Sequence, residues 1–269
     1  MSRIAECLAK LKAQGKTALI PYIAAGDPDL SVTVPLMHKM VASGADLIEL
    51  GVPFSDPSAD GPTIQASMER ALEQGISLLK VLDMVREFRQ QDVNTPIILM
   101  GYLNPIEHLG YQVFAEAAAA AGVDGVLTVD LPPEEADEFI KPMRSNQLDC
   151  IFLVAPTTVE ERVKKIAEYG SGFLYYVSLK GVTGSNILNV EEVEQKLQTI
   201  RGITELPLAV GFGIKDAASA SAVAEVADAV VVGSAIVKKI ESNIGQDEQI
   251  LQQIGDALTA MRVAMDANA

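Results

Sequence analysis

Short runs of apolar residues recur along the whole chain, and a stretch with helical spacing follows each of them. Runs without apolar–polar alternation are typical of parallel strands that are covered on both faces. Glycine or proline interrupts most of the runs, and the helical stretches carry apolar residues at every third or fourth position. The pattern predicts strands at residues 17–24, 46–50, 97–100, 124–129, 149–154, 173–178, 207–210 and 228–232.

The number and order of these elements predict the fold class. Eight strands that alternate with helices, within about 250 residues, match a closed α/β barrel of the (β/α)₈ or TIM type. A doubly wound open sheet is the alternative, but no G-x-G-x-x-G turn follows the first strand. An extra helix is expected at the N-terminus, with Ile4, Leu8 and Leu11 on one face, and extra short helices are expected after the second and eighth strands. Since no linker or low-complexity tract interrupts residues 1–269, we expect a single barrel domain.

Composition and charge argue against several classes of protein. The net charge of −15 disfavours binding to nucleic acid or to an anionic membrane, because both need basic surfaces. No apolar run approaches the roughly 18 residues that span a bilayer, and residues 1–16 lack the pattern of a secretory signal. Cys7 and Cys150 lie far apart, and His38 and His108 are the only histidines. We therefore expect a cytoplasmic protein without a metal site.

One stretch, residues 46–63, carries two unusual carboxylates. Glu49 lies inside an apolar run, where an ionised acid loses its hydration unless it is paired. Asp60 lies in the loop that follows, directly before Gly61 and Pro62, where a helix is expected to begin. Two carboxylates at the carboxyl end of one strand indicate an acid and a base at a barrel mouth. The alternative is that Glu49 forms a salt bridge and that Asp60 only caps the helix.

Alternation along the strand predicts where Glu49 points. It lies on the face opposite its neighbours Ile48 and Leu50. If these two pack against helices, Glu49 points into the barrel mouth, where partial desolvation raises its pKa and lets it act as an acid as well as a base. For Asp60, more solvent and a helix N-terminus are expected to favour the ionised form.

Glycines in the late loops predict a phosphate site. Gly184 follows the sixth strand, Gly213 follows the seventh, and Gly233 and Ser234 follow the eighth, where a helix also begins. Backbone N–H groups at glycines and at a helix N-terminus can hold an anion, and phosphate sites recur in the last loops of this fold. The alternative is that these glycines only permit turns.

Apolar and aromatic residues lie at the strand ends between these two groups. They predict a pocket for a flat, hydrophobic part of a substrate, with ordinary barrel packing as the alternative. The residues are Tyr22, Met100, Tyr102, Leu127, Val129, Leu153, Tyr175 and Phe212.

Longer motifs resemble those of the tryptophan synthase alpha subunit family. IELGVPFSDPSADGPTIQ is similar to the family signature, and PYIAAGDP, ILMGYLNP, GVDGVLTVDLPPEE, GFLYYVSLKGVTG, VGFGIKDA and VVVGSAIV agree along the chain. The resemblance implies a lyase of tryptophan biosynthesis that cleaves indole-3-glycerol phosphate to indole and glyceraldehyde 3-phosphate. It also implies no cofactor in this chain. A pyridoxal-phosphate-dependent beta subunit is the implied partner in an alpha2beta2 heterotetramer, and it receives the indole through a tunnel.

The same resemblance assigns roles to matching residues. Glu49 matches the general acid/base that acts on indole C3 and on the glycerol hydroxyl, and Asp60 matches the carboxylate that pairs with the indole N–H. By the same match, Tyr175 and Thr183 position the carboxylates, Gly184, Gly213, Gly233 and Ser234 bind the phosphate, and Met100 and Phe212 wall the indole pocket.

One residue departs from the family pattern. Ser58 stands where the family usually has an aliphatic residue, in a loop that also contains Pro53, Asp56 and Pro57 and that by resemblance faces the beta subunit. Since both carboxylates are intact, the departure concerns the rigidity of the loop and its coupling to the partner, and not the reaction.

Two other functions stay open at the level of sequence. A different phosphate-binding barrel enzyme would share the late glycines but not the carboxylate pair. A catalytically silent subunit that only activates its partner would not need Glu49 and Asp60.

Overall fold

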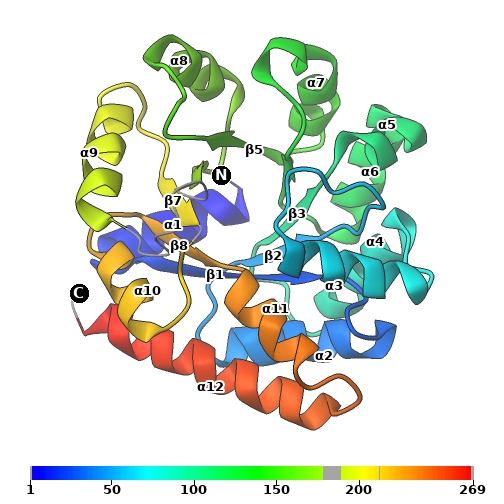
Figure 1. Cartoon of the computed structure of the whole chain (residues 1–269). Coiled ribbons are helices and arrows are strands. Elements are labelled where there is room, and N and C mark those ends of the chain that lie inside the picture. The colour runs from blue at the N-terminus through cyan, green and yellow to red at the C-terminus, as the bar shows by residue number, and fades with distance from the viewer. Residues whose placement is uncertain (1, 178–188, 212, 268–269) are drawn as a thin grey trace.

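The eight strands pair in parallel in chain order, and β1 pairs with β8, so the sheet closes into the predicted barrel (Figure 1). The structure is a computed structural model that describes residues 2–177, 189–211 and 213–267. All eight strands lie close to their predicted positions. They are β1 (Ala18–Ala24), β2 (Ile48–Gly51), β3 (Ile97–Gly101), β4 (Gly125–Thr128), β5 (Asp149–Val154), β6 (Leu174–Val177), β7 (Leu208–Gly211) and β8 (Ala229–Val232).

Helices surround the strands, and an additional helix, α1 (Arg3–Ala13), precedes β1 as predicted (Figure 1). Two helices follow β2 and two follow β8. Within the described ranges, no helix is long and apolar enough to cross a membrane. The remaining helices are α2 (Leu30–Ala42), α3 (Pro62–Glu73), α4 (Leu78–Arg89), α5 (Leu103–Leu109), α6 (Tyr111–Ala121), the 3₁₀ turn η1 (Pro133–Glu135), α7 (Asp137–Ser145), α8 (Glu160–Tyr169), α9 (Val190–Arg201), α10 (Ala217–Ala224), α11 (Ser234–Glu241) and α12 (Asp247–Asp266).

Two helices also follow β3, and the first of them, α5, was not predicted. Its 7 residues include Pro105, so the sequence resembles a turn. The proline lies in the first turn, where its missing N–H would have no partner within the helix. Asp130, from the loop after β4, accepts a hydrogen bond from the Leu103 N–H (2.8 Å). A residue from another loop therefore completes the start of this helix.

Neighbouring residues at the start of β2 belong to different cores. Ile48 and Leu50 pack in the core between the strands and the helices. Leu47 packs in the core inside the barrel. This confirms the predicted faces of the strand, and by alternation it directs Glu49 inward.

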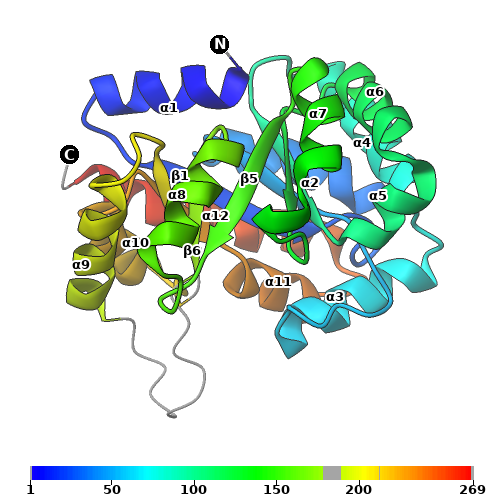
Figure 2. The ribbon, with the colours of Figure 1, turned by 90° about the horizontal axis from the view of Figure 1, so that it is seen from above.

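Helix α1 closes the amino-terminal end of the barrel interior, at the opposite end from α11 (Figure 2). Its buried residues Ile4, Leu8 and Leu11 join the interior core, as predicted. Ile4 is fully buried, and Gly125 makes room for it, because a Cβ at Gly125 would lie 2.9 Å from Ile4 Cδ1. With this end plugged, the barrel mouth is the end formed by the carboxyl ends of the strands.

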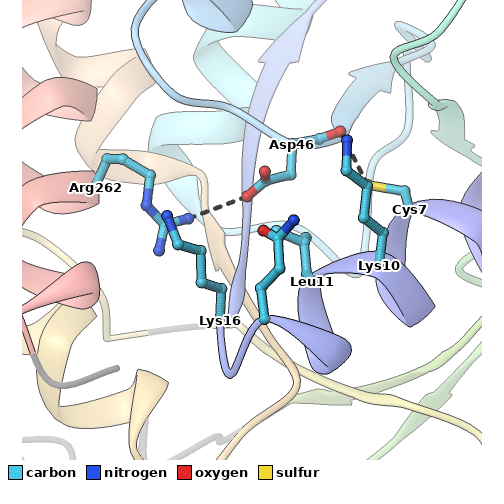
Figure 3. A pocket seen from close by; sticks show the side chains of 7 residues that line it. Cys7, Lys10, Leu11, Lys16, Asp46 and Arg262 are labelled. Atoms are coloured by element: carbon cyan, nitrogen blue, oxygen red, sulfur yellow. Dashed lines mark hydrogen bonds and ion pairs between the residues drawn. The ribbon is translucent and has the colours of Figure 1, made fainter.

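A cavity of about 250 Å³ lies beside α1, away from the barrel mouth (Figure 3). Ion pairs line this region: Arg262 Nη1 lies 3.1 Å from Asp46 Oδ2, and Lys16 Nζ lies 2.9 Å from Asp266 Oδ2. The Cys7 thiol donates to the Asp46 carbonyl oxygen (3.6 Å). Burial raises the pKa of this thiol to about 11, so it stays protonated at neutral pH. These contacts hold α1 and α12 to the start of β2 and give the cavity a structural role.

Replacing Ile4 tests the role of α1 as a plug. Ile4→Ala should lower the free energy of unfolding by about 2–5 kcal/mol, because it removes buried methyl groups from the interior core. Urea unfolding measures the change. Val263→Ala is the control, since Val263 is 65% exposed and should change stability by no more than about 0.5 kcal/mol. An Ile4→Ala loss as small as that of the control contradicts the plug.

Candidate active site

Glu49 lies near the end of β2 with its side chain inside the barrel. Its Cα pairs in register with Tyr22 of β1 and Ile98 of β3, and the residue is only 1% exposed. Among the described residues, Glu49 has no ion-pair partner, and its Oε1 atom has no hydrogen-bond partner. The salt bridge that would make this acid purely structural is thus not found.

Burial determines the protonation of Glu49. Loss of hydration and, to a smaller extent, the negative charge of Asp60 raise the pKa of Glu49 from 4.5 to about 8. The carboxyl group therefore keeps its proton at neutral pH. A protonated acid that faces a barrel mouth is suited to deliver that proton to a bound substrate.

Asp60 is half-buried on the loop between β2 and α3, and it does not cap the helix. The N-cap is Gly61, and α3 begins at Pro62. Instead, the Asp60 carboxylate accepts a hydrogen bond from the Tyr102 hydroxyl (2.6 Å). The alternative of a capping role for Asp60 is therefore wrong.

The environment of Asp60 also differs from the one predicted. Burial raises the pKa of Asp60 above its ordinary value, although the hydrogen bond from Tyr102 lowers it in part. Asp60 is more exposed than Glu49, as expected, but it does not cap the helix, and burial outweighs the hydrogen bond from Tyr102. The tyrosine, and not the helix, supports the ionised form.

Two side chains hold the loop that carries Asp60. The Tyr102 hydroxyl accepts a hydrogen bond from the Ala59 N–H (3.0 Å) while it donates to Asp60. From α3, the Gln65 side-chain amide donates to the carbonyl oxygens of Asp60 (2.8 Å) and Pro57 (3.3 Å). Gln65 was not identified from the sequence, because it acts on backbone carbonyls. Its only sequence signal was its place in the helix that follows the loop.

The middle of this loop faces solvent. Asp56 and Ser58 are exposed, Pro57 is half-buried and Pro53 is buried at the base. The Ser58 N–H donates to the Asp56 carbonyl oxygen (2.8 Å). An exposed position accommodates the serine hydroxyl, but nothing in the structure explains why serine stands there.

The residues of the predicted apolar pocket that the structure describes fall into two groups. At the mouth, Tyr22 and Tyr102 form a cluster against which Met100 and Val129 pack. Deeper in the barrel, Leu127, Leu153 and Tyr175 pack in or against the interior core. The mouth cluster also includes residues that the sequence did not indicate, because they lie in the loop after β2 or on helices: Phe54, Ile64, Met68 and Val237. Phe212 lies outside the described residues.

Two tyrosines of the inner wall lean over glycines. A Cβ at Gly51 would lie 2.3 Å from the Tyr22 hydroxyl oxygen, and a Cβ at Gly211 would lie 2.1 Å from that of Tyr175. Tyr22 pairs in register with Glu49, and Gly51 lies two residues after Glu49. Tyr175 pairs with Ala209, and Gly211 lies two residues after Ala209. The rings therefore lean toward the carboxyl ends of the strands and bring both hydroxyl groups to the barrel mouth.

The late glycines are located partly as predicted. Gly233 is the N-cap residue of α11 and has no side chain to cap the helix, and Ser234 is exposed at the first helical position. A Cβ at Gly233 would lie 3.7 Å from Tyr22 Cβ, so this loop adjoins the pocket. Gly213 has a φ of 80°, which favours glycine for its turn alone. Thr183 and Gly184 lie outside the described residues.

The histidine and acidic residues show no metal-binding arrangement. In the described part of the chain, no group of three or more His, Cys, Asp or Glu side chains could hold a metal ion. His38 of α2 instead stacks on Phe88 of α4, with ring centroids 4.6 Å apart.

Comparisons with known proteins agree on one family. A family model described as "Tryptophan synthase alpha chain" matches residues 8–266. A protein of that description from Nitrosococcus oceani is 59% identical over 267 residues, which are 99% of this chain and 98% of the relative. The Neisseria gonorrhoeae protein is 58% identical over 247 residues, 92% of this chain and 94% of the relative. A crystal structure of tryptophan synthase subunit alpha from Legionella pneumophila is 49% identical, has a TM-score of 0.94 and matches over 99% of both chains.

Tyr102→Phe tests whether the hydrogen bonds of the Tyr102 hydroxyl stabilise the loop that carries Asp60. The change should speed amide hydrogen exchange at Ala59 about fivefold, because the N–H loses an acceptor worth about 1 kcal/mol. Hydrogen exchange of peptides covering residues 53–61 measures it. Tyr111→Phe on α6, where the ring lies edge-on to Phe139 (5.6 Å), is the matched control. If both variants exchange like the wild type, Tyr102 does not hold the loop.

Proposed function

The chain belongs to the tryptophan synthase alpha chain family, and we propose that Glu49 and Asp60 carry out its reaction at the barrel mouth. The chain is a lyase of tryptophan biosynthesis that cleaves indole-3-glycerol phosphate to indole and glyceraldehyde 3-phosphate. One observation carries the residue assignment: Glu49 is a buried acid with no ion-pair partner among the described residues, and its pKa is raised to about 8. We further infer that residues 1–269 work as one barrel domain.

The reaction begins with a proton on carbon C3 of the indole ring. Glu49 holds a proton at neutral pH and faces the mouth, so it delivers that proton to C3. The ring then carries a positive charge that extends to its nitrogen. The Asp60 carboxylate accepts a hydrogen bond from the ring N–H and stabilises this charge. Tyr102 favours the ionised form of Asp60 that this step needs, because its hydrogen bond lowers the pKa of that carboxyl group.

The second half of the reaction returns the proton. Glu49, now a carboxylate, removes the proton from the hydroxyl on the glycerol carbon that is bonded to C3. That oxygen forms the aldehyde C=O bond, the carbon–carbon bond breaks, and its electron pair returns to the ring and neutralises the positive charge. Indole and glyceraldehyde 3-phosphate leave, and Glu49 is protonated again. A raised pKa permits one carboxyl group to be acid and then base.

The other residues of the mouth suit a substrate with a flat ring and a phosphate. The cluster around Tyr22 and Tyr102 provides an apolar wall for the indole ring. Gly233 and Ser234 present the N-terminus of α11, whose N–H groups favour an anion. The family match adds Gly184 and Gly213 to the phosphate site, Phe212 to the wall, and Tyr175 and Thr183 as residues that position the carboxylates.

The partner of this chain is the beta subunit of tryptophan synthase, where the family's pyridoxal phosphate resides. We infer an alpha2beta2 heterotetramer in the cytoplasm, with the loop at Asp56, Pro57 and Ser58 facing the beta subunit. The exposure of this loop supports the inference. Because Asp60 is part of the same loop, a partner that orders it would also position the carboxylate.

Replacing the two carboxylates tests their roles. Glu49→Gln should lower the rate of indole release by about 10²–10⁴-fold, because it removes the acid and base but keeps the shape. Asp60→Asn should also lower turnover strongly and leave phosphate binding largely intact. A coupled assay of indole release from indole-3-glycerol phosphate measures both. Glu73→Gln, at an exposed position on α3, is the matched control.

Stability measurements separate loss of chemistry from loss of fold in this test. The folded protein holds a proton on Glu49 that the unfolded chain releases as pH rises from 4.5 toward about 8, so Glu49 lowers stability over that range. Glu49→Gln should therefore be at least as stable as the wild type at pH 8. A folded Glu49→Gln variant with wild-type activity contradicts the assignment. A wild-type chain that releases no indole, alone or with its partner, would indicate a silent activating subunit.

The beta subunit should speed indole release by this chain severalfold. The loop that carries Asp60 is exposed and is held by few contacts, so docking of a partner favours its closed form. The measurement compares indole release with saturating beta subunit and with the same concentration of serum albumin. Equal rates in the two samples contradict the role of the partner.

A further inference from the structure

We propose that the Tyr22 hydroxyl donates a hydrogen bond to the Glu49 carboxylate when that group gives up its proton, and so controls its acid strength. Tyr22 then acts as a positioning residue that works through Glu49, beyond its place in the apolar wall of the pocket. The inference rests on the proposed role of Glu49 as the acid and base of the reaction.

Tyr22 and Glu49 are direct neighbours across two paired strands. Their Cα atoms pair in register between β1 and β2, and adjacent strands lie about 4.8 Å apart. Both side chains are buried, with 3% and 1% exposure. The Tyr22 hydroxyl and Glu49 Oε1 each lack a hydrogen-bond partner within the described residues. The two groups do not bond to each other in the structure. Since buried tyrosine hydroxyls usually find a partner, an unpaired donor and an unpaired acceptor on neighbouring residues require an explanation.

Gly51 shows where the hydroxyl group lies. It belongs to the same inward face of β2 as Glu49, two residues nearer the mouth, and a Cβ at Gly51 would lie 2.3 Å from the Tyr22 hydroxyl oxygen. The hydroxyl therefore lies on the mouth side of the Glu49 backbone, next to the path of its side chain. The absence of a side chain at Gly51 makes that approach possible.

Among the described residues, one carboxylate and two tyrosines face Glu49. Glu49 is faced by Asp60 from the loop, by Tyr175 from β6 and by Tyr22 from β1, and Asp27 lies near Tyr22. The Tyr102 hydroxyl is already bonded to Asp60. Burial and the nearby carboxylates raise the pKa of Tyr22 well above its ordinary value. Tyr22 therefore remains a hydrogen-bond donor at neutral pH.

This donor matters at the first step of the reaction. Delivery of the proton to C3 leaves a carboxylate in an apolar surrounding, and a hydrogen bond to a charged group stabilises it more than one to a neutral group. While Glu49 keeps its proton and is neutral, a hydrogen bond from the Tyr22 hydroxyl stabilises it less. The bond therefore strengthens as charge develops, which lowers the barrier to proton transfer.

Tyr22→Phe removes only the hydroxyl and keeps the ring in the pocket. We expect kcat/KM for indole release at neutral pH to fall about three- to tenfold, with KM little changed. The basic limb of the pH profile, where Glu49 loses its proton, should move up by about one pH unit, since a carboxylate without this donor holds its proton more tightly. Profiles from about pH 6 to about pH 10 measure the shift.

A purely structural effect would lower the rate and leave the basic limb in place. Tyr102→Phe is the matched comparison, because its hydroxyl bonds Asp60, and it should not move that limb. The proposal is overturned if the basic limb of the Tyr22→Phe pH profile lies where it does in the wild type, whether or not the rate of indole release falls. This conclusion requires that Glu49→Gln is inactive. If Glu49→Gln is fully active, the assignment of Glu49 fails instead, and this inference fails with it.

Discussion

A carboxyl group inside an apolar barrel, with no ion-pair partner among the described residues, is stable only while it keeps its proton, and the proposed chemistry of this site depends on that constraint. Glu49 meets it, since loss of hydration and the nearby Asp60 raise its pKa to about 8. In the proposed mechanism, this is the proton that passes to the indole ring. The same burial makes the folded state less stable as pH rises toward 8, so the site retains an acid that a purely structural core would avoid.

The side chains at the mouth surround Glu49, from which the proton would leave in the proposed reaction. The Tyr102 hydroxyl is bonded to Asp60, and the Tyr22 hydroxyl has no hydrogen-bond partner among the described residues. The barrel holds Glu49 rigidly on a strand, whereas Asp60 lies on a loop held by Tyr102 and Gln65. In the proposed complex, a partner that docks on this loop would position Asp60 without contact with Glu49 itself.

The barrel was predictable because each strand leaves a local mark in the sequence, and Glu49 was conspicuous as an acid inside an apolar run. Features that depend on distant residues were not predictable. At the start of helix α5, Asp130 from another loop accepts a hydrogen bond from the first N–H group. Gln65 acts through carbonyl groups that the fold of the loop brings near, and the turn geometry makes Gly61 the helix cap in place of Asp60. The unpaired hydroxyl of Tyr22 follows from strand register, which no local pattern records.

The protonation state of Glu49 in the free protein tests this account most directly. Infrared difference spectra between the wild type and Glu49→Gln, recorded across a range of pH, isolate the carboxyl band of this one residue. We expect the band of a protonated carboxyl group at pH 7 that disappears as pH passes about 8. A carboxylate band at pH 7, with titration near the ordinary value of 4.5, would contradict the account.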